Sequence, residues 1–412
     1  MNSAQGIAPQ PSPWLSVWLR PRDTIERIVA TNPRYQVLLL AALGGISIVA
    51  FALIDTKLLT GLLHWRVIAI VTLVGAAFGV VNLYVSGVLF LWSSRILGGR
   101  ATTVDLRAAL AWGLAPRVVS LVIWLIVLIA AGIFTAADRL PGTLTITLQV
   151  IAGAFALWSL VATMLMLGRV LNFGFWRTVI CTVLALLSAL VLAALIRTFL
   201  FQPFNTPSGS MKPTLLVGDY FFANKFSYGY SRYSLPFSPP LFSGRVFGSQ
   251  PQRGDIVVFR LPRDDSVDFI KRVVGLPGDT IQMIDGALHI NGQPVKRERI
   301  EDFIDAEDSA RPAKVRQWRE TLPNGVSYAT LGLVDNGFYD NTPVHRVPAD
   351  HYFVLGDNRD NSTDSRMRLE SGGVGYVPLV NITGRAAIIF MSVDRDRRPE
   401  TIRFERLGTL LQ

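Results

Sequence analysis

The sequence contains a single cysteine, Cys181, among its 412 residues. One cysteine excludes an intrachain disulfide and any metal site built from several cysteines. Cys181 lies in an apolar run, where we expect it to act as a small buried hydrophobic residue. The four histidines show no HExxH motif or other ligand spacing, so the sequence gives no support for metal chemistry.

Charged residues are also scarce. They make up 17% of the chain, whereas hydrophobic residues make up 50% and mean hydropathy is +0.37. This composition argues against intrinsic disorder and against a freely soluble cytosolic enzyme, and it favours a membrane protein. The length is sufficient for two or three domains.

Acidic residues are rare in the first half only. Residues 1–201 hold 14 Lys and Arg against 5 Asp and Glu, whereas residues 202–412 hold 26 against 25. The net charge is therefore +9 in the apolar half and +1 in the other half, and membrane topology explains this surplus better than a nucleic-acid partner does. We expect a lipid bilayer as a partner and no nucleic acid.

Five apolar stretches are long enough to cross a bilayer, which needs about 20 helical residues. A cleavable signal peptide is not expected, because the first stretch begins only after about 35 residues that include four arginines. The chain thus divides into an arm (1–35), a transmembrane domain (36–201) and a third domain (202–412). The predicted spans lie near 36–54, 68–93, 118–137, 147–168 and 178–200.

The cations of the connecting segments predict an orientation. Ten lie in the arm, the second loop and the fourth loop, and three in the first and third loops. The positive-inside rule then puts the N-terminus in the cytoplasm, and an odd number of spans puts residue 202 on the opposite side. The ten are Arg20, Arg22, Arg27, Arg34, Arg95, Arg100, Arg107, Arg117, Arg169 and Arg177; the three are Lys57, Arg66 and Arg139.

Apolar residues recur at near-helical spacing in the arm, among them Trp14, Trp18, Ile25, and Ile28 or Val29. With basic residues between them, this pattern predicts a cytoplasmic amphipathic segment at the membrane interface. The arm and the spans together resemble the Yip-type five-span membrane domain over about 1–200. A generic polytopic anchor is the alternative.

After Phe201 the pattern changes to short β-like runs separated by turn residues, which predicts a mainly β domain. Asp285-Gly286 and Asn291-Gly292 are signals of tight hairpin turns. No glycine-rich phosphate loop joins a strand to a helix, so nucleotide binding is not supported. The predicted strands lie in 255–261, 269–276, 280–295, 351–357 and 384–393.

Two segments interrupt these strands. Residues 226–253 are rich in Pro, Ser, Gly and aromatics, and they either rest on the bilayer or form a mobile loop. Residues 297–345 form a polar insertion whose acidic cluster predicts a solvated face rather than a site. The cluster comprises Glu298, Glu301, Asp302, Asp305, Glu307 and Asp308.

Two residues of the β half suggest a catalytic pair. Ser210 lies in a tight Ser-Gly-Ser-Met-Lys-Pro-Thr context just beyond the fifth span, and Lys271 lies in an apolar strand. Ser–Lys pairs are an alternative to the Ser–His–Asp triad, and burial favours the neutral lysine that a base requires. Because strand neighbours face opposite ways, Lys271 and Arg272 cannot both point inward. An outward, solvated Lys271 is the ordinary alternative.

A third segment, GDNRDNSTDSR (356–366), holds more polar groups than a simple turn requires. The hydroxyl of Ser362 could accept a hydrogen bond from the lysine amine or donate one to it. Asp364 and Arg366 could pair and support the loop. A plain turn is the alternative.

The three segments together resemble type I signal peptidase (leader peptidase). That family has a Ser-x-Ser-Met-x-Pro-Thr box outside a membrane span, a strand with Lys-Arg followed by Gly-x-Pro-Gly-Asp, and a Gly-Asp-Asn-x-x-x-Ser-x-Asp-Ser-Arg box. Here these are Ser208 to Thr214, Lys271 to Asp279, and Gly356 to Arg366, in the family order. The resemblance spans about 197–394.

The resemblance implies Ser210 as nucleophile, Lys271 as general base and Ser208 as an oxyanion-hole hydroxyl beside the backbone N–H of Ser210. It implies that Ser362 orients the lysine, and that Asp364 and Arg366 hold that loop. Other residues match positions that line the family's shallow pockets for small residues. These are Phe204, Thr206, Pro207, Met211, Leu215, Phe269 and Ile270.

Two features depart from the family pattern. Thr206 stands where an aliphatic residue is common, which leaves the pocket preference open. Family members usually have one or two spans, so peptidase chemistry does not explain the extra ones.

The resemblance implies a multi-pass protein of the bacterial cytoplasmic membrane, with a signal-peptidase-like catalytic domain on the extracytoplasmic (periplasmic) side. It would remove N-terminal signal peptides from translocated preproteins with neither metal nor organic cofactor. Two alternatives remain at this stage. One is a non-enzymatic membrane scaffold or trafficking module with a β-rich binding domain, and the other is a self-cleaving Ser–Lys regulator of the repressor type.

Overall fold

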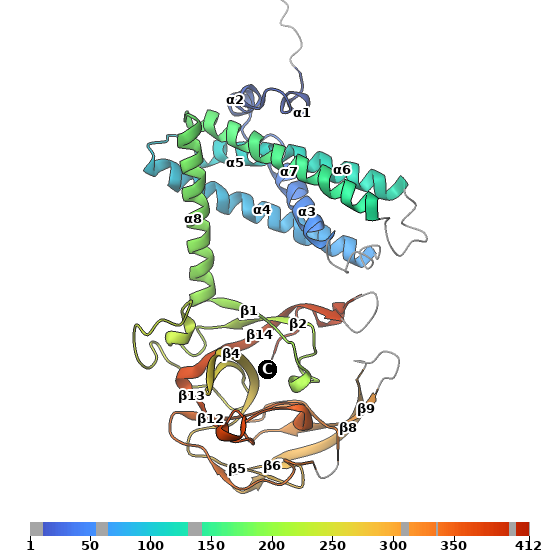
Figure 1. Ribbon diagram of the computed structural model, residues 1–412, viewed down its shortest axis with the longest axis vertical. Helices are drawn as coiled ribbons and strands as arrows, with labels where there is room; N and C mark the ends of the chain where they lie inside the picture. Colours follow the sequence, from blue (N-terminus) through green and yellow to red (C-terminus); the bar gives the residue numbers. More distant parts are fainter. Residues whose placement is uncertain are drawn as a thin grey trace, which may run out of the picture. The chain divides into compact units, whose positions relative to one another are not determined.

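The chain divides into two compact units, Met1–Leu192 and Ala193–Gln412. Helices build the first unit and strands build most of the second (Figure 1). The predicted change from a helical to a mainly β architecture is therefore confirmed. The computed structural model describes residues 11–54, 65–130, 142–305, 313–334, 337–394 and 401–411.

The helices coincide with the apolar runs, and their prolines stand only near helix starts, where no N–H is lost. A capping box begins one of them: the Asp105 N–H donates to the Thr102 hydroxyl, and the Thr102 N–H donates to the Asp105 carboxylate. The helices are α1 (Pro13–Ser16), α2 (Pro21–Thr31), α3 (Val37–Ile54), α4 (Trp65–Ile96), α5 (Thr103–Gly113), α6 (Ala115–Ala130), α7 (Gly142–Leu171) and α8 (Phe175–Phe199).

The predicted count of about five spans is roughly consistent with the structure. Within the described residues, four helical stretches are long and apolar enough to cross a membrane, and a shorter apolar helix, Val37–Ala52, accompanies them. The third predicted span, 118–137, starts too late because α5 and α6 follow one another with only Leu114 between them; its end, 131–137, lies outside the described residues. The four stretches are Ile68–Ile96, Thr103–Val127, Ile146–Leu171 and Phe175–Phe199.

Three of the four arginines assigned to the second loop lie in helices instead. Arg95 belongs to the last turn of α4, Arg107 to α5 and Arg117 to α6, so only Arg100 of that loop lies between helices. Lys57 and Arg139, on the other side of the comparison, lie outside the described residues. The segments assigned to the cytoplasmic side still hold more cations than those assigned to the other side, and the orientation stays a prediction.

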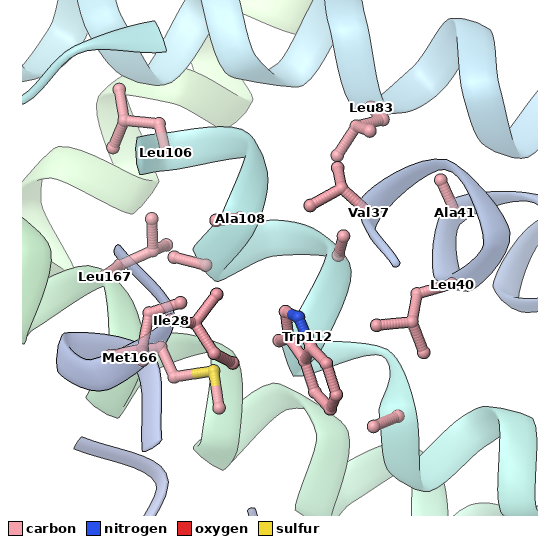
Figure 2. Close-up of a cluster of buried hydrophobic side chains, with 14 of the residues drawn as sticks. Ile28, Val37, Leu40, Ala41, Leu83, Leu106, Ala108, Trp112, Met166 and Leu167 are labelled. Carbon is pink, nitrogen blue, oxygen red and sulfur yellow. The ribbon is translucent and has the colours of Figure 1, made fainter. Parts of the chain in front are cut away.

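The amphipathic arm packs into the helical core. Ile25 and Ile28 of α2 are 0% and 3% exposed, and α2 contacts α5 and α7. Figure 2 shows Ile28 beside Met166 in a cluster that also holds Trp112. The apolar face of α2 that we expected at the membrane interface therefore covers protein, since an apolar stripe buries equally well against other helices.

Cys181 is buried in this same core, as predicted. Elsewhere in the unit, glycines bring α3 and α4 together. A Cβ added at Gly45 would lie 2.2 Å from the carbonyl oxygen of Gly75, and one added at Gly79 would lie 2.0 Å from that of Ala41. The two backbones approach so closely that no side chain fits between them.

The second unit contains three sheets. The largest has eight strands in the order β1-β2-β14-β3-β4-β12-β13, with β15 paired to β14, and the smaller ones have the orders β10-β9-β8 and β11-β5-β6-β7. The strands are β1 (Phe201–Asn205), β2 (Asp219–Asn224), β3 (Ile256–Leu261), β4 (Asp264–Gly275), β5 (Thr280–Ile284), β6 (Ala287–Ile290), β7 (Gln293–Pro294), β8 (Lys296–Asp305), β9 (Ala313–Thr321), β10 (Ser327–Gly332), β11 (His345–Arg346), β12 (His351–Leu355), β13 (Val377–Pro378), β14 (Ile382–Asp394) and β15 (Thr401–Ile402).

Each of the five predicted β segments contains strands, and both predicted hairpin turns are confirmed. Asp285 and Gly286 have φ of 48° and 72°, and Asn291 and Gly292 have φ of 54° and 76°, as tight hairpin turns require. The polar insertion 297–345 is not mainly loop, because β8, β9 and β10 form a sheet there. Its polar composition hid these strands from the sequence pattern.

The glycine contact between α3 and α4 gives a testable expectation. Gly79→Ala should destabilise the first unit by at least about 1–3 kcal/mol, because the added methyl group would overlap the Ala41 carbonyl. Gly153→Ala in α7 is the matched control, since its Cβ meets nothing within 4 Å. Thermal unfolding of the helical circular-dichroism signal in detergent measures both. Equal melting temperatures for the two variants would contradict the expectation.

Candidate active site

Ser210 lies on a short 3-10 turn, Gly209–Met211, that follows β1. The loop after β12 holds this turn in place. The Asn358 N–H donates to the Ser210 carbonyl at 3.1 Å, and Asn358 Nδ2 donates to the Gly209 carbonyl at 3.1 Å. Backbone bonds of this kind fix the direction in which the Ser210 hydroxyl points.

Lys271 comes from β4, where it pairs with Val257 of β3. Its side chain is 3% exposed, so the solvated alternative is wrong. Arg272, the next residue, is 0% exposed. The expectation that only one of the two could point inward is wrong, because both faces of β4 are covered.

The two predicted catalytic side chains meet. Lys271 Nζ lies 2.8 Å from Ser210 Oγ and donates a second hydrogen bond to the Ile270 carbonyl at 2.9 Å. Burial lowers the pKa of Lys271 to about 8, although the charges of Asp364 and Asp357 act in the opposite direction. A much larger share of this amine is neutral near neutral pH than in an exposed lysine.

Ser208 Oγ lies 3.4 Å from Ser210 Oγ. The Ser208 side chain is exposed while that of Ser210 is buried. A hydroxyl in this place can turn toward a group that approaches Ser210 from solvent. The predicted oxyanion donor is thus beside the predicted nucleophile.

Asp364 and Arg366 form the predicted pair. Arg366 Nε and Nη2 donate to the two carboxylate oxygens of Asp364 at 2.9 and 2.8 Å, and the Gly356 N–H donates to the same carboxylate at 3.1 Å. Burial pushes the pKa of Asp364 up, but Arg366 and backbone N–H groups together hold it below its usual value. The carboxylate therefore stays charged and keeps the loop folded.

Ser362 does not make its predicted bond to Lys271. Its hydroxyl is buried and has no hydrogen-bond partner among the described residues. The side chain packs against Gly356, where an added Cβ would lie 2.2 Å from Ser362 Oγ. The amine hydrogens of Lys271 go to Ser210 and to Ile270 instead.

Arg272 and Asp357 form a buried pair that sequence reasoning did not assign. Arg272 Nε and Nη2 donate to the two Asp357 oxygens at 2.8 Å each, and Thr214 Oγ1 donates to Asp357 at 2.6 Å. Residues from all three sequence boxes meet at this carboxylate. Asp357 lies in a quoted motif, so its position was visible but its partners were not.

The insertion also reaches the site. Lys212 Nζ donates to both oxygens of Asp305 at 2.9 Å, which ties β8 to the turn that carries Ser210. The Lys212 side chain is 4% exposed and that of Asp305 is 21% exposed. Glu298 and Glu301 are exposed as expected, but the prediction of a solvated face is wrong for Asp305, and Glu307 and Asp308 lie outside the described residues.

A second contact joins the insertion to the loop after β12. Arg359 Nη1 and Nη2 donate to the two oxygens of Glu320, at 2.7 and 2.5 Å, and Tyr328 donates to the same carboxylate at 3.0 Å. All three side chains are buried. No signal in the sequence links residues so far apart along the chain.

Most of the predicted pocket residues lie around the same turn. Phe204 and Ile270 pack against a cluster that includes the buried side chains of Met211 and Leu215. Thr206 is 2% exposed, and its hydroxyl has no hydrogen-bond partner among the described residues. Two predicted residues differ: Pro207 is exposed, and Phe269 packs against another cluster while its ring centre lies 5.4 Å from Lys271 Nζ.

In the described part of the chain, no group of three or more His, Cys, Asp or Glu side chains is arranged to hold a metal ion. The site therefore consists of a serine hydroxyl, a buried amine and a second serine hydroxyl.

Comparisons with known proteins match both halves of the chain to protein families. The model for "Signal peptidase, peptidase S26" matches residues 179–391, and the Yip1 domain model matches residues 15–196. Signal peptidase I of Rickettsia typhi is 48% identical over 209 residues, which cover 49% of this chain and 76% of the relative. Signal peptidase I of Rickettsia prowazekii is 45% identical over 229 residues, covering 54% and 80%.

One solved structure is also similar in sequence. The crystal structure of a signal peptidase I from Enterococcus faecalis is 30% identical. The match covers 33% of this chain and 97% of that chain, with a TM-score of 0.21.

The Lys212–Asp305 pair gives an expectation about stability. Asp305→Asn should destabilise the second unit by roughly 3 kcal/mol, because it removes the carboxylate that both hydrogen bonds from the buried Lys212 amine reach. Lys212→Met should cost less, since Asp305 keeps some contact with water. Glu298→Gln is the control, because its pair with Lys296 is 49% and 70% exposed and should contribute at most about 1 kcal/mol. Chemical denaturation of the full chain in detergent measures all three, and equal effects would contradict the expectation.

Proposed function

The chain belongs to the signal peptidase family, peptidase S26, and on this basis we propose that it is a membrane-bound serine endopeptidase that cleaves N-terminal signal peptides from translocated preproteins. The observation that carries the proposal is the distance of 2.8 Å between Lys271 Nζ and Ser210 Oγ in a buried place. The proposed dyad has Ser210 as nucleophile and Lys271 as general base.

The reaction begins when neutral Lys271 accepts the hydroxyl proton of Ser210. The oxygen then attacks the scissile carbonyl of the signal peptide, and a tetrahedral oxyanion forms. Ser208 Oγ and the backbone N–H of Ser210 donate to that oxyanion; removing one such donor typically costs about 2.7–4 kcal/mol. Lys271 gives its proton to the leaving amine, and an acyl-enzyme remains on Ser210.

Hydrolysis of the acyl-enzyme reuses the same base. Lys271, neutral again, takes a proton from a water molecule, whose oxygen attacks the ester carbon. The bond from that carbon to Ser210 Oγ then breaks, Lys271 returns the proton to Ser210 Oγ, and the cleaved signal peptide leaves with a free carboxyl group. Asp357 and Asp364 act at a distance, because Arg272 and Arg366 already engage their oxygens. The positioning role proposed for Ser362 needs a rearrangement, since its hydroxyl does not contact the amine here.

The substrate binds as an extended strand beside the β-strands of the second unit. Phe204 and Ile270 pack against the cluster that holds the buried side chains of Met211 and Leu215. In the proposed complex, small side chains next to the scissile bond contact this cluster. Thr206 lies near them with its buried hydroxyl, and Pro207 and Phe269 complete the proposed set.

The protein is a bacterial membrane protein with several apolar helices. We place its N-terminus in the cytoplasm, in accordance with the arginine distribution. We place the second unit on the extracytoplasmic side of the inner membrane, which requires the shorter apolar helix Val37–Ala52 to cross the bilayer together with the four longer stretches. Phe237 and Phe247 in the segment 226–253 are 103% and 85% exposed, which supports contact of this segment with the bilayer. Such placement keeps the site near a substrate that is itself embedded.

Variants of the dyad test the proposal. Ser210→Ala and Lys271→Met should each lower cleavage of a preprotein in detergent by at least about 10⁴-fold, because nucleophile and base act as one unit. Lys225→Met is a matched control: Lys225 is also 3% exposed with its pKa lowered to about 8 by burial, yet it donates to the Ser234 carbonyl rather than to Ser210.

Thermal unfolding of the same preparations separates lost chemistry from lost folding. Folded Ser210→Ala protein that cleaves normally would overturn the mechanism. A loss in Lys225→Met as large as that in Lys271→Met would show that any buried lysine of this unit matters only for folding. Complete absence of cleavage by the wild-type protein would favour the non-enzymatic alternative.

The pKa of Lys271 predicts a pH dependence. Only the neutral amine accepts a proton, so kcat/KM should rise with pH and level off above about pH 8, falling about tenfold for each unit below it. Initial rates on a preprotein between about pH 6 and about pH 9 measure this limb. A flat profile in folded enzyme would argue against a lysine base.

A further inference from the structure

A cavity lies among the apolar helices of the first unit. Its volume is about 200 Å³, and side chains of α3, α6 and α7 line it. Most of its surface is apolar, and Ser47, Arg117, Ser120 and Gln149 supply its polar groups. α6 packs against both α3 and α7. A cavity of this size is several times larger than a single water molecule requires.

Arg117 supplies the charge of this cavity. It lies within the helical stretch Thr103–Val127, in the first turn of α6. Its guanidinium makes no hydrogen bond or ion pair with any described residue, while its backbone carbonyl accepts hydrogen bonds from Ser47 and Ser120 at 3.3 and 2.8 Å. A cation among apolar helices is expensive, and it normally faces a partner, a water-filled cavity or the interface where lipid headgroups lie.

The described helices offer Arg117 no carboxylate. The only Asp or Glu in the described helices α3 to α8 is Asp105, whose carboxylate caps α5 at Thr102. The cavity also has free space on the α7 side, since a Cβ added at Gly153 would meet no atom within 4 Å. An anion from outside the chain therefore fits both the charge and the volume.

We propose that this cavity binds the phosphate group of an anionic phospholipid. A guanidinium offers paired donors that match phosphate oxygens, and basic pockets between membrane helices suit lipid headgroups. The neighbouring surface fits acyl chains: Val122 of α6 and Ile146 and Val150 of α7 are 49%, 62% and 66% exposed. These exposed apolar side chains favour a lipid over free phosphate as the source of the anion.

Native mass spectrometry of the full chain in a neutral detergent tests the proposal. Phosphatidylglycerol, phosphatidylcholine and inorganic phosphate are added in separate titrations, and retained ligand is counted. Phosphatidylglycerol should be retained more strongly than phosphatidylcholine. Inorganic phosphate at the same concentration should neither be retained nor displace it.

Two variants assign any binding to the cavity. Arg117→Met should weaken phosphatidylglycerol retention about fivefold or more, the scale of one basic group near a headgroup. Gly153→Leu keeps the charge but fills the free space, and should weaken retention at least as much without lowering the melting temperature, because leucine is the better helix former. Arg100→Met is the control, since Arg100 is an exposed cation in the segment between α4 and α5.

Several outcomes would overturn the proposal. Unchanged retention in folded Gly153→Leu protein would show that lipid binds elsewhere. If Arg100→Met weakens retention as much as Arg117→Met does, the lipid binds through general surface charge and not in the cavity. Equal retention of the two lipids, or displacement by inorganic phosphate, would exclude an anionic lipid as the specific occupant.

Discussion

Desolvation of one amine is the constraint on which the rest of the second unit depends. Lys271 is almost wholly removed from water, and its ammonium form loses hydration that no carboxylate of the described residues replaces at contact distance. The neutral amine beside the Ser210 hydroxyl follows from that loss. Everything that covers the site therefore acts on the chemistry as well as on the fold.

The buried cations of this unit fall into two groups. Lys212, Arg272, Arg359 and Arg366 each contact a carboxylate, which offsets part of the cost of burying their charge. Lys225 and Lys271 have no such contact among the described residues, and these two lysines have their pKa lowered to about 8. Of the two, only Lys271 lies beside a hydroxyl that it can deprotonate. Burial lowers the pKa of both lysines, but only at Lys271 does the neutral amine lie beside a serine hydroxyl.

Contacts from distant parts of the chain keep the site dry. The turn of Ser210 is bonded to Asn358, the strand of Lys271 is joined through Arg272 to Asp357, and the insertion contributes Asp305 and Glu320. The insertion thus contributes to the architecture of the site rather than forming a loop appended to it. The helical unit follows a different rule, because close backbone contact at glycines and apolar side chains account for its packing.

The sequence by itself determined much of this protein. Periodicity and composition located the apolar helices, the β segments and both glycine turns, because these depend on local preferences and on burial of a stripe or face. Three boxes in family order identified Ser210 and Lys271 as a candidate pair, and the structure brings them within a hydrogen bond. The arm's helix was also visible, but not that its apolar face packs on α5 and α7.

Only the tertiary structure decided which polar groups meet. Asp305 and Glu320 lie in a segment whose polar pattern reads as solvated, and their partners Lys212 and Arg359 are 93 and 39 residues away in the chain. The sequence pattern predicts Arg117 in a loop, whereas in the structure it lies in the helical stretch Thr103–Val127 that α5 and α6 form together. Pairing across such distances depends on how strands and helices stack, and a linear pattern carries no record of that stacking. Burial of a charge, and with it the pKa of Lys271, is likewise a property of the packed chain.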